Sequence, residues 1–172
     1  RMFPLLEIIK EKDRINNAKS PADIWTGHIN GANADKVLID LPVYIRDTSS
    51  MQDEVVTFNR TTLSNIERRI QFFSMLAPAR AKVIPVVSSL LLKTGEANTL
   101  TQQIQALRET FDSIAIRTFT SSFDTDLPEI QTNLQATDIL IYDLDTAHPL
   151  NQKIKKQLIS LASIEAPYKV AL

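Results

Sequence analysis

The sequence predicts an α/β chain of repeating strand–helix units around a parallel sheet, and two observations support this fold class. Short apolar runs rich in Val, Ile and Leu recur along the 172 residues, most of them without the apolar–polar alternation of half-exposed strands. Segments with helical spacing separate the runs at intervals of ~24 to ~46 residues, about the length that a βαβ crossover needs. The expected strands are 3–9, 37–41, 83–87, 114–119, 139–142 and 168–172.

The first helix is expected to begin at a capped proline. Ser20 is suited to the N-cap, Pro21 to the first helical position and Asp23 to the third, where an acid completes a capping box. We expect this helix to be short, because Gly27 and Gly31 interrupt it.

The second helix is expected to begin after Thr61 or Thr62 and to end before Pro78. Apolar residues recur there at steps of three and four, with the charged residues 67–69 between them. The apolar stripe consists of Leu63, Ile66, Ile70 and Phe73. The polar stretch 44–60 that precedes this helix predicts a loop or a short additional helix.

Three further helices are expected in the second half of the chain. One begins at Thr99, a shorter one spans 127–134, and a strong one spans 149–163 with its lysines mostly outward. The inward-facing stripes are Leu100, Ile104, Leu107 and Phe111 in the first, and Leu150, Ile154, Leu158 and Leu161 in the last; the outward lysines are Lys153, Lys155 and Lys156.

Two architectures fit this order of elements: an open doubly wound sheet, or part of a (βα)8 barrel. Against a complete barrel, the sequence predicts fewer strands than the eight that a barrel requires. Against a simple open sheet, strand-like runs stand at both ends of the chain. We therefore expect residues 1–172 to form a single α/β domain, most consistent with an incomplete TIM-like barrel and a fragment of a longer barrel. Its unpaired edges predict association with another copy or with the missing part of the same protein.

Composition excludes several classes of function. Lys and Arg number 19 against 20 Asp and Glu. The net charge is therefore close to zero and provides no long-range electrostatic attraction to nucleic acid or to an anionic membrane. Cysteine is absent, which removes disulfides, thiolate metal sites and cysteine nucleophiles, and three glycines cannot build a dinucleotide or Walker motif. No run approaches the ~18 apolar residues of a membrane helix. A cytoplasmic protein without nucleic-acid or membrane partners is expected.

Short motifs in the strands resemble the beta protein family, which takes its name from a bacteriophage protein and also occurs in bacteria. The first is Phe3-Pro4-Leu5-Leu6-Glu7-Ile8; the others are Leu38-Ile39-Asp40-Leu41, Val83-Ile84-Pro85-Val86-Val87 and Tyr142-Asp143-Leu144-Asp145. The resemblance spans nearly the whole chain and implies a fold and a phage or bacterial setting. Because the family has no assigned activity, the resemblance implies no reaction.

Polar residues at the expected strand ends form a candidate catalytic site. Ligands of parallel α/β sheets and barrels bind outside the carboxyl ends of the strands, where these side chains would converge. The candidate catalytic residues are Glu7, Asp40, Arg117, Asp143 and His148.

The same rim could hold a divalent cation. Carboxylates are the oxygen ligands that Mg²⁺ prefers, and the candidate metal ligands are Glu7, Asp40, Asp143 and Asp145. Arg117 could then clamp a phosphate or carboxylate, and His148 could act as general acid or base. Salt bridges and helix caps would explain the same acids without chemistry, and Asp143 with Asp145 fits an Asx turn.

Asp40 is the strongest single candidate for a functional residue, because it lies inside an apolar run. A buried carboxylate there needs a partner or a raised pKa.

Two functions of different class remain open. The first is a hydrolase or lyase that acts, with a metal, on a small anionic or phosphate-containing substrate. The second is a non-catalytic interaction protein in a phage or phage-defence setting, which the lack of any recognisable catalytic motif favours. A shared rim pocket would favour the enzyme, and a large contiguous apolar patch the interaction protein.

Overall fold

A computed structural model describes residues 3–10, 19–45, 48, 50–145, 147–148, 151–166 and 168–171. These residues form one six-stranded sheet in which every strand pairs with its sequence neighbours, in the order β1-β2-β3-β4-β5-β6. All five pairings are parallel, which confirms the expected fold class. The strands are β1 (Leu5–Glu7), β2 (Val37–Asp40), β3 (Val83–Val87), β4 (Ala115–Phe119), β5 (Ile139–Asp143) and β6 (Tyr168–Ala171).

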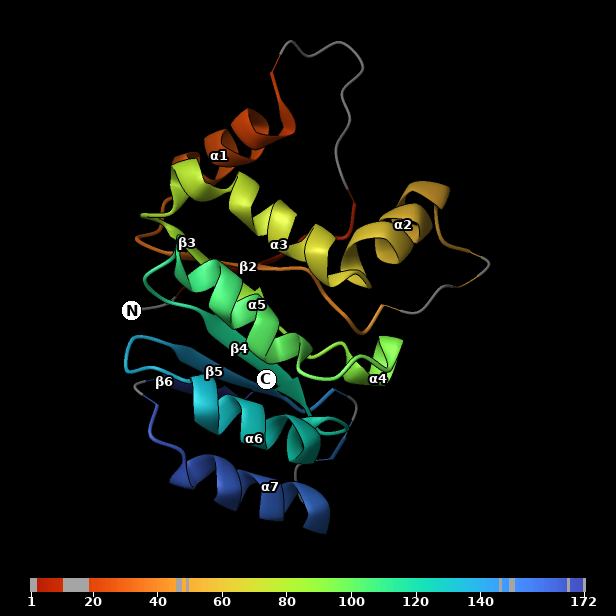
Figure 1. Ribbon diagram of the computed structural model, residues 1–172, viewed down its shortest axis with the longest axis vertical. Coiled ribbons are helices and arrows are strands. Elements are labelled where there is room, and N and C mark those ends of the chain that lie inside the picture. The colour runs from red at the N-terminus through yellow and green to blue at the C-terminus, as the bar shows by residue number, and fades with distance from the viewer. Residues whose placement is uncertain are drawn as a thin grey trace.

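Helices fill the connections between the strands. They are α1 (Pro21–Gly31), α2 (Asp53–Phe58), α3 (Ile66–Met75), α4 (Leu91–Thr94), α5 (Thr99–Arg108), α6 (Phe123–Asn133) and α7 (Gln152–Ser163), with a π-helical turn η1 (Asn59–Leu63) and a 3₁₀ turn η2 (Ala77–Ala79). Helices α1, α3, α5, α6 and α7 lie along the same outer side of the sheet (Figure 1). A strictly sequential strand order puts all crossovers on one face, as in a barrel, whereas a doubly wound sheet reverses direction and covers both.

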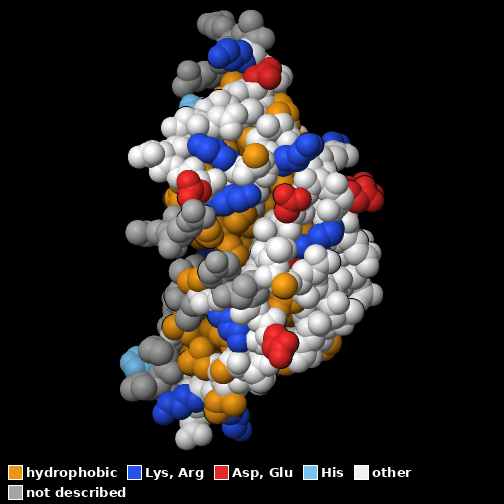
Figure 2. All heavy atoms as spheres, turned by 90° about the vertical axis from the view of Figure 1, so that its left-hand side faces the viewer, with side chains coloured by type: hydrophobic (Ala, Val, Ile, Leu, Met, Phe, Trp, Pro, Cys, Tyr) orange, Lys and Arg blue, Asp and Glu red, His pale blue; other side chains and the backbone are white. Residues whose placement is uncertain are grey.

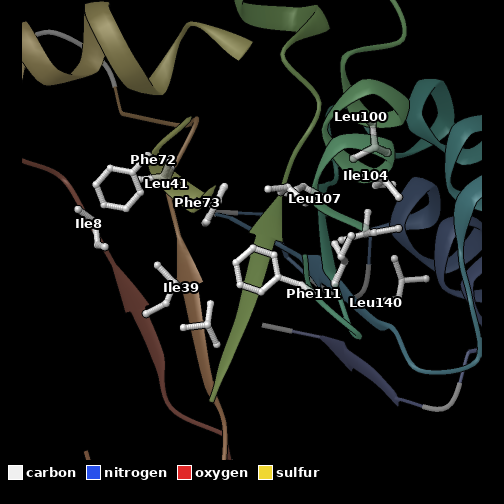
Figure 3. Packing of buried hydrophobic residues seen from close by; sticks show 14 of the residues in the cluster. Ile8, Ile39, Leu41, Phe72, Phe73, Leu100, Ile104, Leu107, Phe111 and Leu140 are labelled. Carbon is white, nitrogen blue, oxygen red and sulfur yellow. The ribbon is translucent and has the colours of Figure 1, made fainter. Parts of the chain in front are cut away.

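The hydrophobic core lies between the sheet and these helices. Alternate strand residues such as Ile39 and Leu140 meet Phe73 from α3 and Leu107 from α5, and all four side chains are fully buried. Figure 3 shows these side chains pointing toward one another from the strands and helices. Burying each such side chain stabilises the fold by about 1.5–3 kcal/mol.

The opposite, concave face of the sheet carries a second apolar cluster. Leu38, Ile84, Val86, Ala115, Ile139 and Ile141 form it, with Phe3 and Leu5 packed against it. The six buried members are at most 8% exposed, although they point away from the helix layer. Curvature of the sheet brings them together, and the six strands form a curled sheet that resembles an incomplete barrel.

Two expectations about the helices are corrected by the structure and one is confirmed. Helix α1 continues through Gly27 to Gly31 and is not short, because a complete capping box at Ser20 and the buried Ile29 support it. The stretch 44–60 holds the short helix α2 and the beginning of η1, which confirms the additional helix expected there. Helix α3 begins at Ile66 with Asn65 as its N-cap, later than expected, because η1 takes up residues 59–63.

Arg69 was expected between the apolar positions of α3, yet it is fully buried. It lies three residues after Ile66 and four before Phe73, on the same side of the helix. Its Nη1 donates to the carbonyls of Leu41 and Leu63 at 2.6 and 3.1 Å, and its Nε donates to Gln103 Oε1 at 3.0 Å. A guanidinium therefore occupies a place where the apolar pattern predicts none.

The last expected helix has a later start in the structure. Helix α7 begins at Gln152 with Asn151 as its N-cap; Pro149 and Leu150 lie outside the described residues. Ile154 and Leu161 are buried, and the lysines at 153, 155 and 156 are exposed as expected. Within the described part of the chain, no helix is long and apolar enough to span a membrane.

Candidate ligand site at the carboxyl end of the sheet

The strand register places the predicted site residues on the concave face, at the carboxyl ends of their strands. Glu7 on β1 stands beside Asp40 on β2, and Asp143 on β5 stands beside Phe119 on β4. Two residues before each charged position, the concave cluster has an apolar side chain, so the charged groups form the layer directly above it. The arrowheads of the strands point toward the side of the molecule that carries α4 (Figure 1).

Arg117 is the centre of this layer. Its Nη1 donates to Glu7 Oε1 at 2.7 Å and to Asp40 Oδ2 at 2.5 Å. Its Nε and Nη2 donate to Asp143 Oδ2 at 3.0 and 2.5 Å. One guanidinium therefore gathers carboxylates from three other strands. We define Glu7, Asp40, Arg117 and Asp143 as the rim cluster.

The contact between Arg117 and Glu7 depends on the curl of the sheet. Strands β4 and β1 are separated by two others, and three strand spacings amount to about 14 Å in a flat sheet. A hydrogen bond of 2.7 Å across that span requires the strands to curve toward each other. The geometry that makes the fold barrel-like also assembles the site.

Two aromatic rings flank the guanidinium. The Cζ atom of Arg117 lies 5.1 Å from the ring centroid of Tyr44 and 5.4 Å from that of Phe119, within the range of cation–π attraction. The Tyr44 hydroxyl also donates to Glu7 Oε2 at 2.6 Å. The two rings therefore contact the guanidinium of Arg117 in addition to its three carboxylate partners.

Asp40 and Arg117 differ in how burial affects them. Burial raises the pKa of Asp40 above its usual range, and the attraction of Arg117 and Arg69 offsets this only in part. Burial lowers the pKa of Arg117, but its bonds to Glu7, Asp143 and Asp40 outweigh this and raise it overall, so the guanidinium stays charged. The expectation that a buried Asp40 needs a partner or a raised pKa is confirmed on both counts.

Arg69 lies close to the same carboxylate from the helix layer. Burial lowers the pKa of Arg69 to about 10, and Asp40 opposes the shift, so Arg69 remains a cation at neutral pH. Asp40 Oδ1 and Arg69 Nη2 are both buried and have no hydrogen-bond partner among the described residues. Asp40 is thus hydrogen-bonded to Arg117 through one oxygen only, while Arg69 attracts it without a hydrogen bond between them.

The remaining candidates, Asp145 and His148, are not members of the rim cluster. The backbone N–H of Asp145 donates to Asp143 Oδ1 at 2.7 Å, which is the Asx turn weighed as the alternative for this pair. Asp145 is exposed and has a φ of 51°. His148 is exposed on the segment after β5. Among the described residues, no group of three or more His, Cys, Asp or Glu is arranged to hold a metal ion.

Sequence reasoning missed two residues of the site, Tyr44 and Arg69. An aromatic residue four positions after Asp40, in an otherwise polar stretch, is a usable signal for a side chain that folds back over a strand end. Arg69 carries only the helical spacing to Phe73, and a charged residue at such a position is usually expected to face solvent.

The strands follow the order of the sequence, the helices cover one side of the sheet, and the rim cluster lies at the carboxyl ends of the strands. The chain is therefore a parallel α/β protein that resembles an incomplete barrel and carries a charged site at this rim. A model of the beta protein family matches residues 1–169, and the chain belongs to this family. No curated protein and no solved structure matches the chain.

Proposed function

We propose that this chain binds a small ligand with a protonated amine at the rim cluster, through the carboxylates of Glu7 and Asp143. Arg117 acts as a positioning residue that holds these carboxylates in place. The observation that carries the proposal is the charge ratio of the cluster, in which one guanidinium faces three carboxyl groups.

At the rim itself the carboxylates of Glu7 and Asp143 outnumber the guanidinium of Arg117, because the second cation, Arg69, is fully buried and approaches Asp40 from the helix layer. Gathering like charges in a partly dry site destabilises the free protein, and an incoming cation relieves that cost. The arrangement is therefore complementary to a positive group. Tyr44 and Phe119 add aromatic surface that attracts organic cations in particular.

Exposure identifies the side chains that a ligand can reach. The Glu7 side chain is 33% exposed and that of Asp143 is 12% exposed, whereas the Asp40 side chain is fully buried. Glu7 and Asp143 each keep free lone pairs beside their bonds to Arg117. Asp40 supports the cluster from below and does not contact the ligand.

The rim geometry favours this ligand over the small anion expected from the sequence. Arg117 already donates to three carboxylates, so it has little left to offer a phosphate. Mg²⁺ would satisfy the same charge excess as an amine, but no described group of acids and histidines is arranged to hold a metal. Hydrolase or lyase chemistry, with His148 as general acid or base, stays a prediction beyond this binding function.

Isothermal titration of the chain with n-butylamine, MgCl₂ and inorganic phosphate tests the proposal. We expect n-butylamine to bind and phosphate not to bind. Glu7→Gln should weaken amine binding by about tenfold, because a hydrogen bond to a charged partner is lost. Glu109→Gln is the matched control, since Glu109 is an exposed carboxylate at the end of α5, beyond the opposite ends of the strands.

Binding of each of the three probes has a different meaning for the proposal. Phosphate binding in preference to n-butylamine would contradict the proposal, and so would equal effects of the Glu7 and Glu109 substitutions. Mg²⁺ binding without amine binding would replace the organic cation by a metal and favour the metal-assisted enzyme expected from the sequence.

A non-catalytic interaction protein remains the second candidate. The exposed large hydrophobic residues among those described are Leu6, Ile9, Tyr44, Leu92, Ile159 and Val170, which come from several different elements. On the face in Figure 2, basic and acidic side chains are interspersed, with hydrophobic ones between them. Association through the outer strands β1 and β6, a cytoplasmic location and a phage or bacterial setting stay predictions.

A further inference from the structure

A cleft beside the rim cluster offers a second subsite. It has a volume of about 720 Å³, within the usual range of small-molecule sites, and it lies among the loops that follow β2, β3, β4 and β5. Its lining includes Tyr44 and Phe119, the two rings that flank Arg117, and also Ser89, Lys93, Ser122 and Asp145. A ligand held at the rim cluster therefore has this cleft directly next to it.

One hydroxyl group of this cleft is anchored by a buried carboxylate. Ser122 Oγ donates to Asp126 Oδ2 at 2.7 Å, and Thr118 Oγ1 donates to the same oxygen at 2.8 Å. Asp126 is only 2% exposed. Burial raises the pKa of Asp126 overall, and the bonds from Ser122 and Thr118 offset this only in part.

This anchoring fixes the direction of the Ser122 hydrogen. A hydroxyl has one hydrogen and two lone pairs, and the Ser122 hydrogen is committed to Asp126. One lone pair of Ser122 Oγ accepts the backbone N–H of Phe119 at 3.3 Å, and the other is available to the cleft that Ser122 lines. Ser89 Oγ likewise accepts one backbone N–H, that of Leu91 at 3.3 Å, and keeps a lone pair for the cleft.

The two charged residues that line the cleft are of opposite sign, and of the two only Asp145 can accept a hydrogen bond from a ligand. The Lys93 ammonium group donates to Asn59 Oδ1 at 2.6 Å and to the carbonyls of Val43 and Ile45 at 3.3 Å, so its hydrogens serve the loops. Asp145 adds an exposed carboxylate, which accepts only.

We infer that the cleft is a subsite for a second hydrogen-bond-donating group of the ligand, an ammonium or a hydroxyl. The inference rests on the proposed function and narrows it, since the ligand becomes a small amine with a second donor a few bonds away. The serine oxygens and Asp145 would accept from that donor, while Glu7 and Asp143 bind the first amine.

Two probes of similar size separate the two subsites. We expect 1,4-diaminobutane to bind the wild-type chain about tenfold more tightly than n-butylamine, because only the diamine has a donor at both ends. Ser122→Ala should remove this preference and leave n-butylamine binding unchanged. Asp126→Asn, which keeps the shape of the side chain, should also reduce the preference, because its amide donates and releases a serine hydrogen toward the cleft.

The outcomes distinguish failure of the cleft from failure of the rim. Equal affinity of the two probes for the wild type, or a preference that persists in variants with unchanged thermal unfolding, would overturn the cleft inference and leave the proposed function standing. Failure of both amines to bind would overturn both. Glu7→Gln should weaken the binding of both probes, since both place an ammonium group at the rim.

Discussion

Arg117 and Glu7 are 110 positions apart in the sequence and lie on strands separated by two others, yet their side chains meet at 2.7 Å. The contact joins the first strand of the sheet to the fourth across the concave face. It therefore reports the curl of the sheet and the assembly of the rim cluster at the same time.

Replacing Arg117 should be strongly destabilising. Arg117→Met leaves three carboxylates close together without their cation, and we expect the free energy of unfolding to fall by about 3–5 kcal/mol at neutral pH. The loss should be smaller at acid pH, because burial raises the pKa of Asp40 and a neutral Asp40 needs no cation beside it. Urea denaturation at neutral and at acid pH measures the difference.

Arg108→Met provides the matched control for Arg117. Arg108 forms a bidentate ion pair with the buried Asp138, at 2.7 Å for both bonds, next to the beginning of β5. We expect this variant to be destabilised as well, but to bind n-butylamine like the wild type. Loss of amine binding in Arg108→Met would show that binding follows overall stability and not the rim.

Asp40 should make stability depend on pH in a defined direction. Its pKa in the folded chain lies above the ordinary value of 3.8, so the folded state holds this proton more tightly than the unfolded state. The contribution is fully present below about pH 4 and is lost as the pH rises through the folded pKa. The wild-type free energy of unfolding, minus that of Asp40→Asn, should therefore decrease between about pH 4 and about pH 7. A difference that increases over this range would mean that Arg117 and Arg69 outweigh burial.

Tyr44 should resist ionisation because it is partly buried and bonded to Glu7. Partial burial, followed by the bond to Glu7, raises the pKa of Tyr44 to about 12. At about pH 10.5 an ordinary tyrosine is mostly ionised. We expect almost no phenolate absorbance at that pH in the difference between wild type and Tyr44→Phe, and a larger signal when the same pair is compared in a Glu7→Gln background, where burial remains but the charge of Glu7 is gone. A signal in the wild-type pair would place Tyr44 away from Glu7.

Arg69 should stabilise the fold through its buried hydrogen bonds. Arg69→Met leaves Gln103 Oε1 and the carbonyls of Leu41 and Leu63 without their donor in a buried place. We expect a loss of about 3 kcal/mol in the free energy of unfolding. A loss below 1 kcal/mol in urea denaturation would indicate that water reaches these groups.

The strands and the convergence of Glu7, Asp40, Arg117 and Asp143 could be predicted from the sequence, whereas Asp145 and His148 were expected at the site and are not part of the cluster. Apolar runs such as 83–87 indicate strands covered on both faces, and a charge at the end of such a run, as at Asp40 and Asp143, marks the carboxyl rim of a parallel sheet. These signals are local, so a single sequence contains them.

The role of Arg117 could not be predicted, because it depends on geometry across the sheet. As a residue type, arginine suits an anionic ligand, but in the folded chain its donors are taken by Glu7, Asp40 and Asp143. Arg69 and η1 were missed for a related reason: tertiary contacts override the local pattern of helix formation.

A crystal structure grown with n-butylamine tests the rim proposal most directly. We predict that the ammonium nitrogen lies within hydrogen-bond distance of the Glu7 and Asp143 carboxylates, with Arg117 still bonded to both. An anion from the crystallisation medium on Arg117, with Glu7 and Asp143 turned away, would contradict the proposal and restore the anion clamp expected from the sequence.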